Sequence, residues 1–390
     1  MLDDPRPFYA RARAEEPIFW AEEWQMWVAT RYDDVKAIAR DAARFSSLNS
    51  ISPVSVAPPP ELLEVLMQGF PLLPSLVDSD PPIHTRGRAL VSDALSLKRI
   101  GSFEPVLRDL ANDLIDGFID RGRVEFVSAF AIPLPGSFIV DLLGLPRADL
   151  DRVNDWTSHS SAIFAGRGTL EELVAHGREF VTFQHYLAAA VEERRASPRD
   201  DALSDIVRGA AEVPPLGVAE LVNMLLQIVF AGYETTAGML AAAAVELARD
   251  PALLAALKAD PAIGPRIIEE TLRVSSPIHS MYRSANEDVE LGGVTIRKGE
   301  RVQIAYISAN HDDERFAEPD RFELGRACPH LAFGQGPHFC IGAPLARLEG
   351  RIALERIAAR FETLRLVPDQ RLEFFPSATA RRLEAVELEW

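Results

Sequence analysis

The chain has 390 residues, 47% of them hydrophobic, which is enough to bury a sizeable core in one large domain or in two to three small ones. Its 41 Lys and Arg stand against 58 Asp and Glu, so the formal net charge is −17, which argues against a general nucleic-acid binder. The two cysteines, Cys328 and Cys340, exclude a disulfide framework and favour a reducing cytoplasm.

The N-terminal residues show no basic and then apolar segment, so we expect no signal peptide. The longest apolar stretch, residues 224–244, is interrupted by Gln227, Glu234 and two threonines. Such polar groups are costly in lipid, so we expect a buried core helix and no membrane span.

The chain opens with short apolar runs at 17–20 and 26–30 that predict strands, followed by a helix near 33–40. The proline-rich residues 50–60 predict a loop inside a domain. Helical periodicity then dominates from residue 83 to about 209. Residues 217–249 predict one long helix, apolar on nearly every face, that runs through the centre of a large domain.

Residues 287–307 alternate in character and contain Gly292 and Gly293, which predicts a hairpin. Residues 344–364 predict another helix, and the chain ends in strand-like pieces. We find no internal repeat. The pattern therefore predicts a single, mostly α-helical domain with small β-sheets over residues 1–390.

Residues 333–342 read FGQGPHFCIG, in which the glycines permit tight turns and the close approach of a flat ligand. Pro344 suits the first turn of a helix, so Cys340 is expected just before a helix N-terminus, where the dipole and free N–H groups lower the pKa of a thiol. An inert buried cysteine is the commonest alternative, and we assign it to Cys328. The glycines, His338 and the helix start together favour a functional thiolate at Cys340.

This loop resembles the haem-binding loop FxxGxxxC of the cytochromes P450, matched by Phe333, Gly336 and Cys340 and followed by Gly342. Three further motifs in the family's order extend the resemblance over about residues 5–390. The resemblance implies a helical triangular prism in which haem b lies buried between the long central helix and the cysteine loop. It also implies that Cys340 ligates the iron and that its thiolate favours O–O cleavage.

Residues 231–236 read AGYETT midway along the long helix. Small Ala231 and Gly232 leave room for a ligand, and Thr235 can hydrogen-bond to a carbonyl one turn earlier and loosen the helix. Alone, these features fit a satisfied core threonine. The resemblance implies instead that Glu234 and Thr235 form an acid–alcohol pair that delivers protons.

Residues 270–273 form an ExxR motif on one helix face, which alone would predict a surface ion pair. The resemblance implies that Glu270 and Arg273 form a buried structural pair with Arg321 as the third member.

Haem propionates need forked or cationic donors, and the resemblance implies this role for His84, Arg88, Arg283 and His338. Each of them, taken alone, also fits a plain surface cation.

The implied reaction inserts one atom of O2 into a substrate. Electrons come from NAD(P)H through a ferredoxin and its reductase, because two cysteines cannot hold a cluster of their own. A peroxide-driven oxygenase on the same fold and a haem-based gas or redox sensor are the alternatives. The chain can also be the haem domain of a longer fusion. We expect a cytoplasmic monomer, active in secondary metabolism, that binds neither nucleic acid nor membrane.

The family's pocket-lining segments correspond to residues 49–80, 160–185 and 277–282, and they predict an apolar pocket for a small organic substrate, with His279 as a polar contact. The implied lining residues are Leu72, Leu73, Phe164, Phe230, Ile278, His279 and Met281. A redox partner is expected at a basic patch of Arg86, Lys98, Arg99, Arg347 and Arg351.

Overall fold

The computed structural model describes residues 4–52, 57–166, 168–212, 214–375, 377 and 379–390. Its contacts divide the chain into two compact units, which are described separately. The first unit comprises Met1–Pro53, Ile100–Pro135 and Glu234–Trp390, and the second comprises Val54–Arg99 and Gly136–Tyr233. Three of the four boundaries between them fall within helices, which are α5 (Leu97–Ser102), α7 (Pro133–Leu142) and α11 (Val218–Arg249).

The second unit contains helices and, in its described residues, no β-strand. Besides its parts of α5, α7 and α11, these are α3 (Pro60–Leu66), α4 (Ile83–Ala94), α8 (Leu150–Ala165), α9 (Leu170–Ala196) and α10 (Ala202–Ala210). Helix α9 begins at a capping box in which Thr169 and Glu172 satisfy each other's backbone N–H groups. It packs on α8 and α3, while α10 packs on α4.

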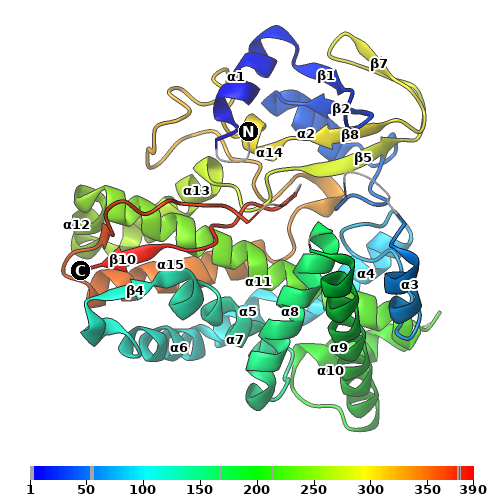
Figure 1. The fold of residues 1–390 in the computed structure, drawn as a ribbon, viewed down its shortest axis with the longest axis horizontal. Helices are drawn as coiled ribbons and strands as arrows, with labels where there is room; N and C mark the ends of the chain where they lie inside the picture. Colours follow the sequence, from blue (N-terminus) through cyan, green and yellow to red (C-terminus); the bar gives the residue numbers. More distant parts are fainter. Residues whose placement is uncertain (1–3, 53–56, 167, 213, 376, 378) are drawn as a thin grey trace. The chain divides into compact units, whose positions relative to one another are not determined.

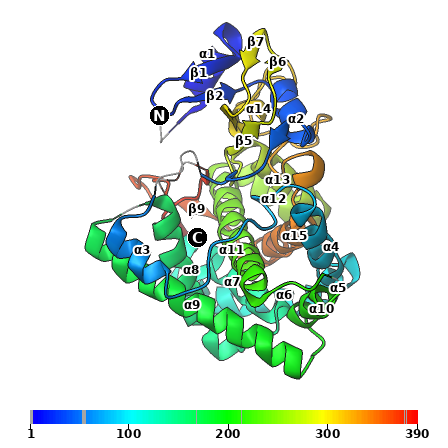
Figure 2. The same ribbon diagram turned by 90° about the vertical axis from the view of Figure 1, so that its right-hand side faces the viewer.

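The first unit holds the remaining helices (Figure 1). They are α1 (Arg6–Glu15), α2 (Tyr32–Arg40), α6 (Glu104–Asp116), α12 (Pro251–Ala259), α13 (Gly264–Val274), α14 (Tyr306–Ala309) and α15 (Ala343–Arg360). Helix α15 packs against α6, α12 and α13, and Figure 2 shows it among them. A Cβ at Gly350 would lie 2.7 Å from Ile268 Cδ1 and 3.0 Å from Met239 Cε, so this glycine lets α13 and α11 approach α15 closely.

All the strands described belong to the first unit and form three sheets. The largest has the order β1 (Ile18–Ala21), β2 (Met26–Ala29), β8 (Arg301–Ile304), β5 (Met281–Ala285) and β3 (Phe45–Ser46). The second has the order β4 (Arg123–Glu125), β10 (Glu387–Glu389) and β9 (Arg365–Leu366). The third is the hairpin of β6 (Val289–Leu291) and β7 (Val294–Ile296), whose turn residues Gly292 and Gly293 have φ of +58° and +85°, so the predicted hairpin is confirmed.

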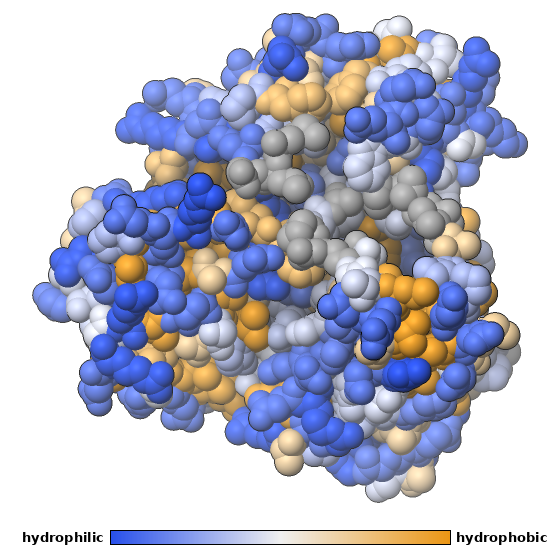
Figure 3. Space-filling model, in the orientation of Figure 1, coloured by the Kyte–Doolittle hydropathy of each residue, from blue (hydrophilic) through white to orange (hydrophobic). Residues whose placement is uncertain are grey.

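Helix α11 has 32 residues and begins one residue later than the sequence predicts. By length and composition it could cross a membrane, but 78% of its apolar window is buried inside the structure, which is typical of a core helix. Hydrophilic side chains cover much of the face seen in Figure 3, in keeping with the net charge of −17. The expected mostly helical fold with small sheets is confirmed.

Candidate functional site

The loop that precedes α15 holds Cys340 at the start of that helix. The Cys340 amide donates a hydrogen bond to the Phe333 carbonyl at 2.8 Å, which closes the loop on itself. Helix α15 begins at Ala343, with Gly342 as its N-cap and Pro344 in its first turn. The predicted position of the half-buried Cys340 before a helix N-terminus is therefore confirmed, and the positive end of the helix dipole favours its thiolate.

Two glycines of this loop adopt conformations that other residues avoid. Gly334 and Gly336 have φ of +68° and +73°. A Cβ at Gly336 would lie 2.7 Å from the Arg40 Cα, so its absence lets the loop rest on the end of α2. A Cβ at Gly342, by contrast, would have only the Cys340 sulfur within 4 Å, at 3.8 Å.

The buried ion pair of the ExxR motif is present, but its predicted third member is wrong. Arg273 donates two hydrogen bonds to Glu270, at 2.8 and 2.9 Å, and their side chains are 2% and 4% exposed. The second arginine on Glu270 is Arg326, whose Nε lies 3.0 Å from Oε1. Arg321 contributes only its carbonyl, which accepts hydrogen bonds from Arg273 and Arg326. Its own guanidinium is 65% exposed and pairs with Glu318.

A hydrogen-bonded path leads from this ion pair to the cysteine loop. Arg273 donates to the carbonyls of Asn310 and Pro319, at 2.9 and 2.7 Å. The side-chain oxygen of Asn310 accepts the Leu331 amide at 2.6 Å, two residues before Phe333. The pair therefore supports the backbone that enters the loop, consistent with the scaffolding role expected from the sequence.

The predicted acid–alcohol pair lies on the part of α11 that belongs to the first unit. Glu234 is 6% exposed, and its carboxylate lies 3.9 Å from Nε of Arg382, a partner that the sequence did not reveal. Thr235 is half-buried. A buried acid beside a hydroxyl has the components of a proton relay, and Arg382 supplies a positive charge next to it.

The small residues before this pair differ in their surroundings. Ala231 is exposed. A Cβ at Gly232 would lie 2.6 Å from Ile139 Cδ1, within the second unit. The absence of a side chain at Gly232 is therefore needed for helix packing, and its expected role in leaving room for a ligand stays a prediction.

Helix α15 carries a buried acid that the sequence analysis missed. Glu349 is 1% exposed, and Thr236 donates a hydrogen bond to it at 3.3 Å. Burial raises the pKa of Glu349 to about 8, because a charged carboxylate loses its hydration there, and the hydrogen bond from Thr236 opposes this only weakly. The sequence signal for this buried acid was a glutamate on an otherwise apolar helix face. Its partner Thr236 could not be found in the same way, because it lies 113 residues away in the sequence.

The four predicted propionate partners lie in both units. In the first unit, Arg283 is 3% exposed and donates to the Tyr282 carbonyl at 2.8 Å. Burial raises the pKa of the Tyr306 phenol, and the charge of Arg283 opposes that rise. The Tyr306 hydroxyl lies 3.3 Å from where a Gly334 Cβ would be, so Tyr306 contacts the cysteine loop.

The other three candidates differ in burial and in location. His338 is half-buried in the cysteine loop. In the second unit, α4 carries His84, which is 4% exposed, and Arg88, which is half-buried, one turn apart on one face, as predicted.

These residues fit a haem bound through Cys340. The thiol sits at a helix N-terminus with room for a side chain at the neighbouring Gly342, which suits a flat macrocycle. Arg283 is a buried guanidinium, and such a group requires anionic or carbonyl partners of the kind that propionates supply. Cys328 is also half-buried, but its sulfur contacts the Pro329 carbonyl at 3.8 Å, and no helix begins directly after Cys328.

The predicted substrate-lining residues also fall in both units. In the second unit, the Phe164 ring contacts Phe230 edge-on with 5.7 Å between ring centres, and Leu72 and Phe164 are 57% and 49% exposed. Leu73 is half-buried there. In the first unit, Ile278 and His279 are half-buried and Met281 is buried at the start of β5.

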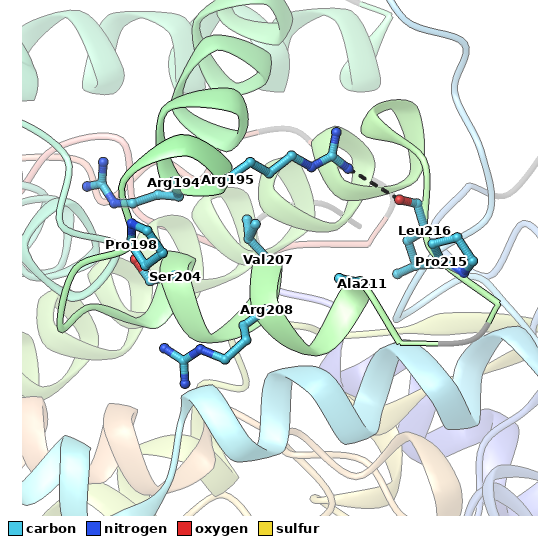
Figure 4. A pocket seen from close by; sticks show the side chains of 9 residues that line it. All are labelled: Arg194, Arg195, Pro198, Ser204, Val207, Arg208, Ala211, Pro215 and Leu216. Carbon is cyan, nitrogen blue, oxygen red and sulfur yellow. Dashed lines mark hydrogen bonds between the residues drawn. The ribbon is translucent and has the colours of Figure 1, made fainter.

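A pocket of about 400 Å³ on the second unit lies elsewhere, where α9 ends and α10 runs (Figure 4). Its arginines are already engaged: Arg195 binds Glu192 and the Leu216 carbonyl, and Arg208 pairs with Asp205. The pocket shares no residue with the predicted site, and its balanced charges identify no ligand.

Most of the cations predicted to receive a redox partner are engaged too. Arg347 binds Glu269, and Arg351 binds two glutamates. In the second unit, Arg86 donates to backbone carbonyls and Arg99 pairs with Asp205. Paired cations attract an acidic partner less strongly than free ones, so the predicted patch is weaker than the sequence suggested.

Comparisons with known proteins point to one family. The cytochrome P450 family model matches residues 264–379. Cytochrome P450 107B1 of Saccharopolyspora erythraea is 36% identical over 92% of this chain and 88% of its own length. Cytochrome P450 monooxygenase PikC of Streptomyces venezuelae is 34% identical over 99% of this chain and 91% of its own. The structure of cytochrome P450 CREJ in complex with (4-ethylphenyl) dihydrogen phosphate matches with a TM-score of 0.94 and 31% identity, covering 100% of this chain and 98% of that one.

This chain belongs to the cytochrome P450 family. It is a cytochrome P450 monooxygenase of the bacterial type, and family membership implies the use of haem and O2.

Proposed function

We propose that the protein binds haem b through Cys340 and inserts one oxygen atom into a small, largely apolar organic substrate of secondary metabolism. The position of the Cys340 thiol at the N-terminus of α15, with room for a side chain at the neighbouring Gly342, is the observation that carries this proposal. His338 and Arg283 of the first unit and His84 and Arg88 of the second are the proposed partners of the propionates. Both units would then belong to one haem domain.

When bound, haem supplies the activation of dioxygen. The chain's part is to hold charge and protons in place. The helix dipole of α15 and the closed backbone of the loop keep the Cys340 sulfur anionic. Glu234 and Thr235 hold and pass protons, and Arg382 keeps a positive charge beside Glu234.

The substrate would contact Leu72, Leu73, Phe164, Phe230, Ile278, His279 and Met281. The ligand named for the CREJ structure is an aromatic phosphate ester, which supports a compact aromatic substrate. A screen for ligands that shift the haem band from low to high spin would identify the class. We further propose a cytoplasmic monomer that receives electrons from a ferredoxin and its NAD(P)H-dependent reductase, to be tested by NAD(P)H consumption in a reconstituted system.

The ligand assignment is tested by replacing each cysteine. Cys340→Ala should abolish the carbon-monoxide band of thiolate-ligated haem in the reduced protein, whereas Cys328→Ala should keep it. A normal band in Cys340→Ala would refute the proposed haem ligation.

The proton relay is tested by coupling. Thr235→Ala should keep haem binding and the spin shift but release hydrogen peroxide in place of product, because losing a positioned proton donor costs about 10²- to 10⁴-fold in the assisted step. Thr236→Ser is the matched control, since Thr236→Ala would also remove the hydrogen bond to Glu349. Full coupling in Thr235→Ala would refute the proposed proton relay through Thr235.

A further inference from the structure

A second carboxylate on α13 reaches the cysteine loop from outside the buried ion pair. Glu269, which precedes Glu270 in the chain, accepts two hydrogen bonds from Arg347 of α15, from Nε at 2.7 Å and from a terminal nitrogen at 2.9 Å. This forked geometry fixes the plane and the position of the guanidinium. The two side chains are 42% and 41% exposed, so the contact is open to solvent on one side.

The same carboxylate also faces a buried histidine. His330 Nε2 lies 3.3 Å from Glu269 Oε2, and the histidine side chain is 7% exposed. The Ala332 amide donates to His330 Nδ1 at 3.1 Å, so Nδ1 is an acceptor and the ring proton of the neutral histidine resides on Nε2, facing Glu269. Burial alone would raise the pKa of Glu269, but hydrogen bonds from Arg347 and His330 outweigh it and lower that pKa to about 2.

Arg347 and His330 lie on the ring of Phe333, the first residue of the cysteine motif. The Arg347 guanidinium carbon is 4.6 Å from the Phe333 ring centre, and the His330 ring centre is 5.7 Å from it. Phe333 is also the residue whose carbonyl accepts the Cys340 amide. Glu269 therefore holds both Arg347 and His330, and these two side chains contact Phe333.

The charge of Arg347 is also felt at the sulfur. The hydrogen bond to Glu269 is the main cause that raises the pKa of Arg347, and the negative charge of Cys340 adds to it. Arg347 is therefore a cation within electrostatic reach of the Cys340 thiolate. The carboxylate of Glu269 reduces the effective positive charge of Arg347.

We propose that Glu269 and Arg347 are positioning residues for the Cys340 ligand, with Glu269 holding the Arg347 cation on Phe333 and setting how much positive charge the sulfur senses. This inference rests on the proposed haem ligation by Cys340. A cation beside the thiolate favours the reduced iron, because reduction adds a negative charge to the site. Removing the cation and removing its carboxylate should therefore shift the reduction equilibrium in opposite directions.

The test is spectroelectrochemical titration of the haem-loaded protein. At a fixed applied potential, Arg347→Gln should lower the reduced-to-oxidised ratio about fivefold or more, and Glu269→Gln should raise it by a smaller factor. The double variant should return close to wild type, which a merely structural loss of the pair would not produce. Arg351→Gln, one turn further along α15 and also paired with carboxylates, is the matched control and should change the ratio less than twofold.

Arg347→Lys separates charge from position. It keeps the cation but loses the fork, so the ratio should stay near wild type while the fraction of thiolate-type carbon-monoxide complex falls. If the Gln variants load too little haem to titrate, Arg347→Met and Glu269→Met remove the same charges and provide the same comparison. Shifts in one direction for both single variants, or none larger than that of Arg351→Gln, would overturn the inference. Neither result would affect the ligand assignment, which depends on Cys340→Ala alone.

Discussion

In the cluster around Glu270, the side chains of Glu270, Arg273 and Arg326 are 4%, 2% and 10% exposed, and Arg273 alone donates five hydrogen bonds within 3.0 Å. In a second cluster the side chains are 18% to 37% exposed. This half-exposed ring joins α6 to α15 and consists of Glu104, Arg108, Arg351 and Glu355. Each of its arginines contacts both of its glutamates.

The two clusters contain the same side-chain types and have similar contact distances, but water reaches only one of them. In the buried cluster every charge depends on protein partners, because the cost of desolvation is recovered only when all donors and acceptors are matched. In the half-exposed ring, water replaces a lost partner. Exposure, more than geometry, should therefore decide what each cluster contributes to stability.

The largest effect should follow from breaking the buried pair. Glu270→Ala leaves the Arg273 guanidinium without its carboxylate and should cost about 3–5 kcal/mol of unfolding free energy. We expect little soluble, haem-loaded protein, measured by urea unfolding and by haem content. A variant that unfolds like wild type would show that Arg273 is satisfied by the surrounding carbonyls alone.

Glu349 is a buried acid whose partner is a hydroxyl and not a cation. The stability of the protein should therefore depend on pH in a way that distinguishes Glu349 from the paired carboxylates. Its pKa is raised to about 8 in the folded protein, so the unfolded chain loses this proton first. Stability is thus highest below the unfolded value of 4.5, falls as the pH rises through about 8, and then levels off. At about 1.4 kcal/mol per pKa unit, the rise from 4.5 to about 8 corresponds to about 4–5 kcal/mol, so Glu349→Gln should be more stable than wild type by up to that amount near pH 9 and not near pH 5.

The control for that experiment lies on the same helix. Burial works to raise the pKa of Glu355, but hydrogen bonds from Arg108 and Arg351 outweigh it and lower that pKa. Its ionised form therefore stabilises the fold above its unfolded pKa, and Glu355→Gln should destabilise the protein at neutral and alkaline pH. Equal responses of the two variants to pH would contradict the assignment of a raised pKa to Glu349.

The sequence predicted what depends on local pattern. The long apolar run located α11 to within one residue, Gly292 and Gly293 predicted the β6–β7 hairpin, and Pro344 predicted the start of α15. The second arginine of the buried cluster was missed because residues 312–330 have no periodicity to follow, and Arg326 lies 56 residues from Glu270. Glu349 and its partner Thr236 are further apart still, so only folding brings them together.

The corrected membership of the buried cluster can be tested directly. Arg326→Ala removes a hydrogen bond to Glu270 and three more to backbone carbonyls, so it should cost about 2 kcal/mol. Arg321→Ala should stay within about 0.5 kcal/mol of wild type, because only its carbonyl takes part and the substitution keeps it. Urea unfolding of both variants gives the answer, and a larger loss for Arg321→Ala would restore the original assignment.

The smallest effect should come from the half-exposed ring. Arg351→Ala breaks contacts to Glu104 and Glu355, but water and the remaining Arg108 partly compensate both carboxylates, so the loss should be no more than about 1 kcal/mol. Because exposed pairs are screened, the difference from wild type should shrink as salt rises from low to about 1 M. The same salt series on Glu270→Ala should change little, since that cluster is closed to ions. If the ring variant instead loses as much stability as Glu270→Ala, or if its loss is independent of salt, then exposure does not separate the two clusters. The four-residue ring would then act as a cooperative network. Each arginine contacts and orders both glutamates, so the second arginine can bind them with a smaller loss of side-chain conformational entropy.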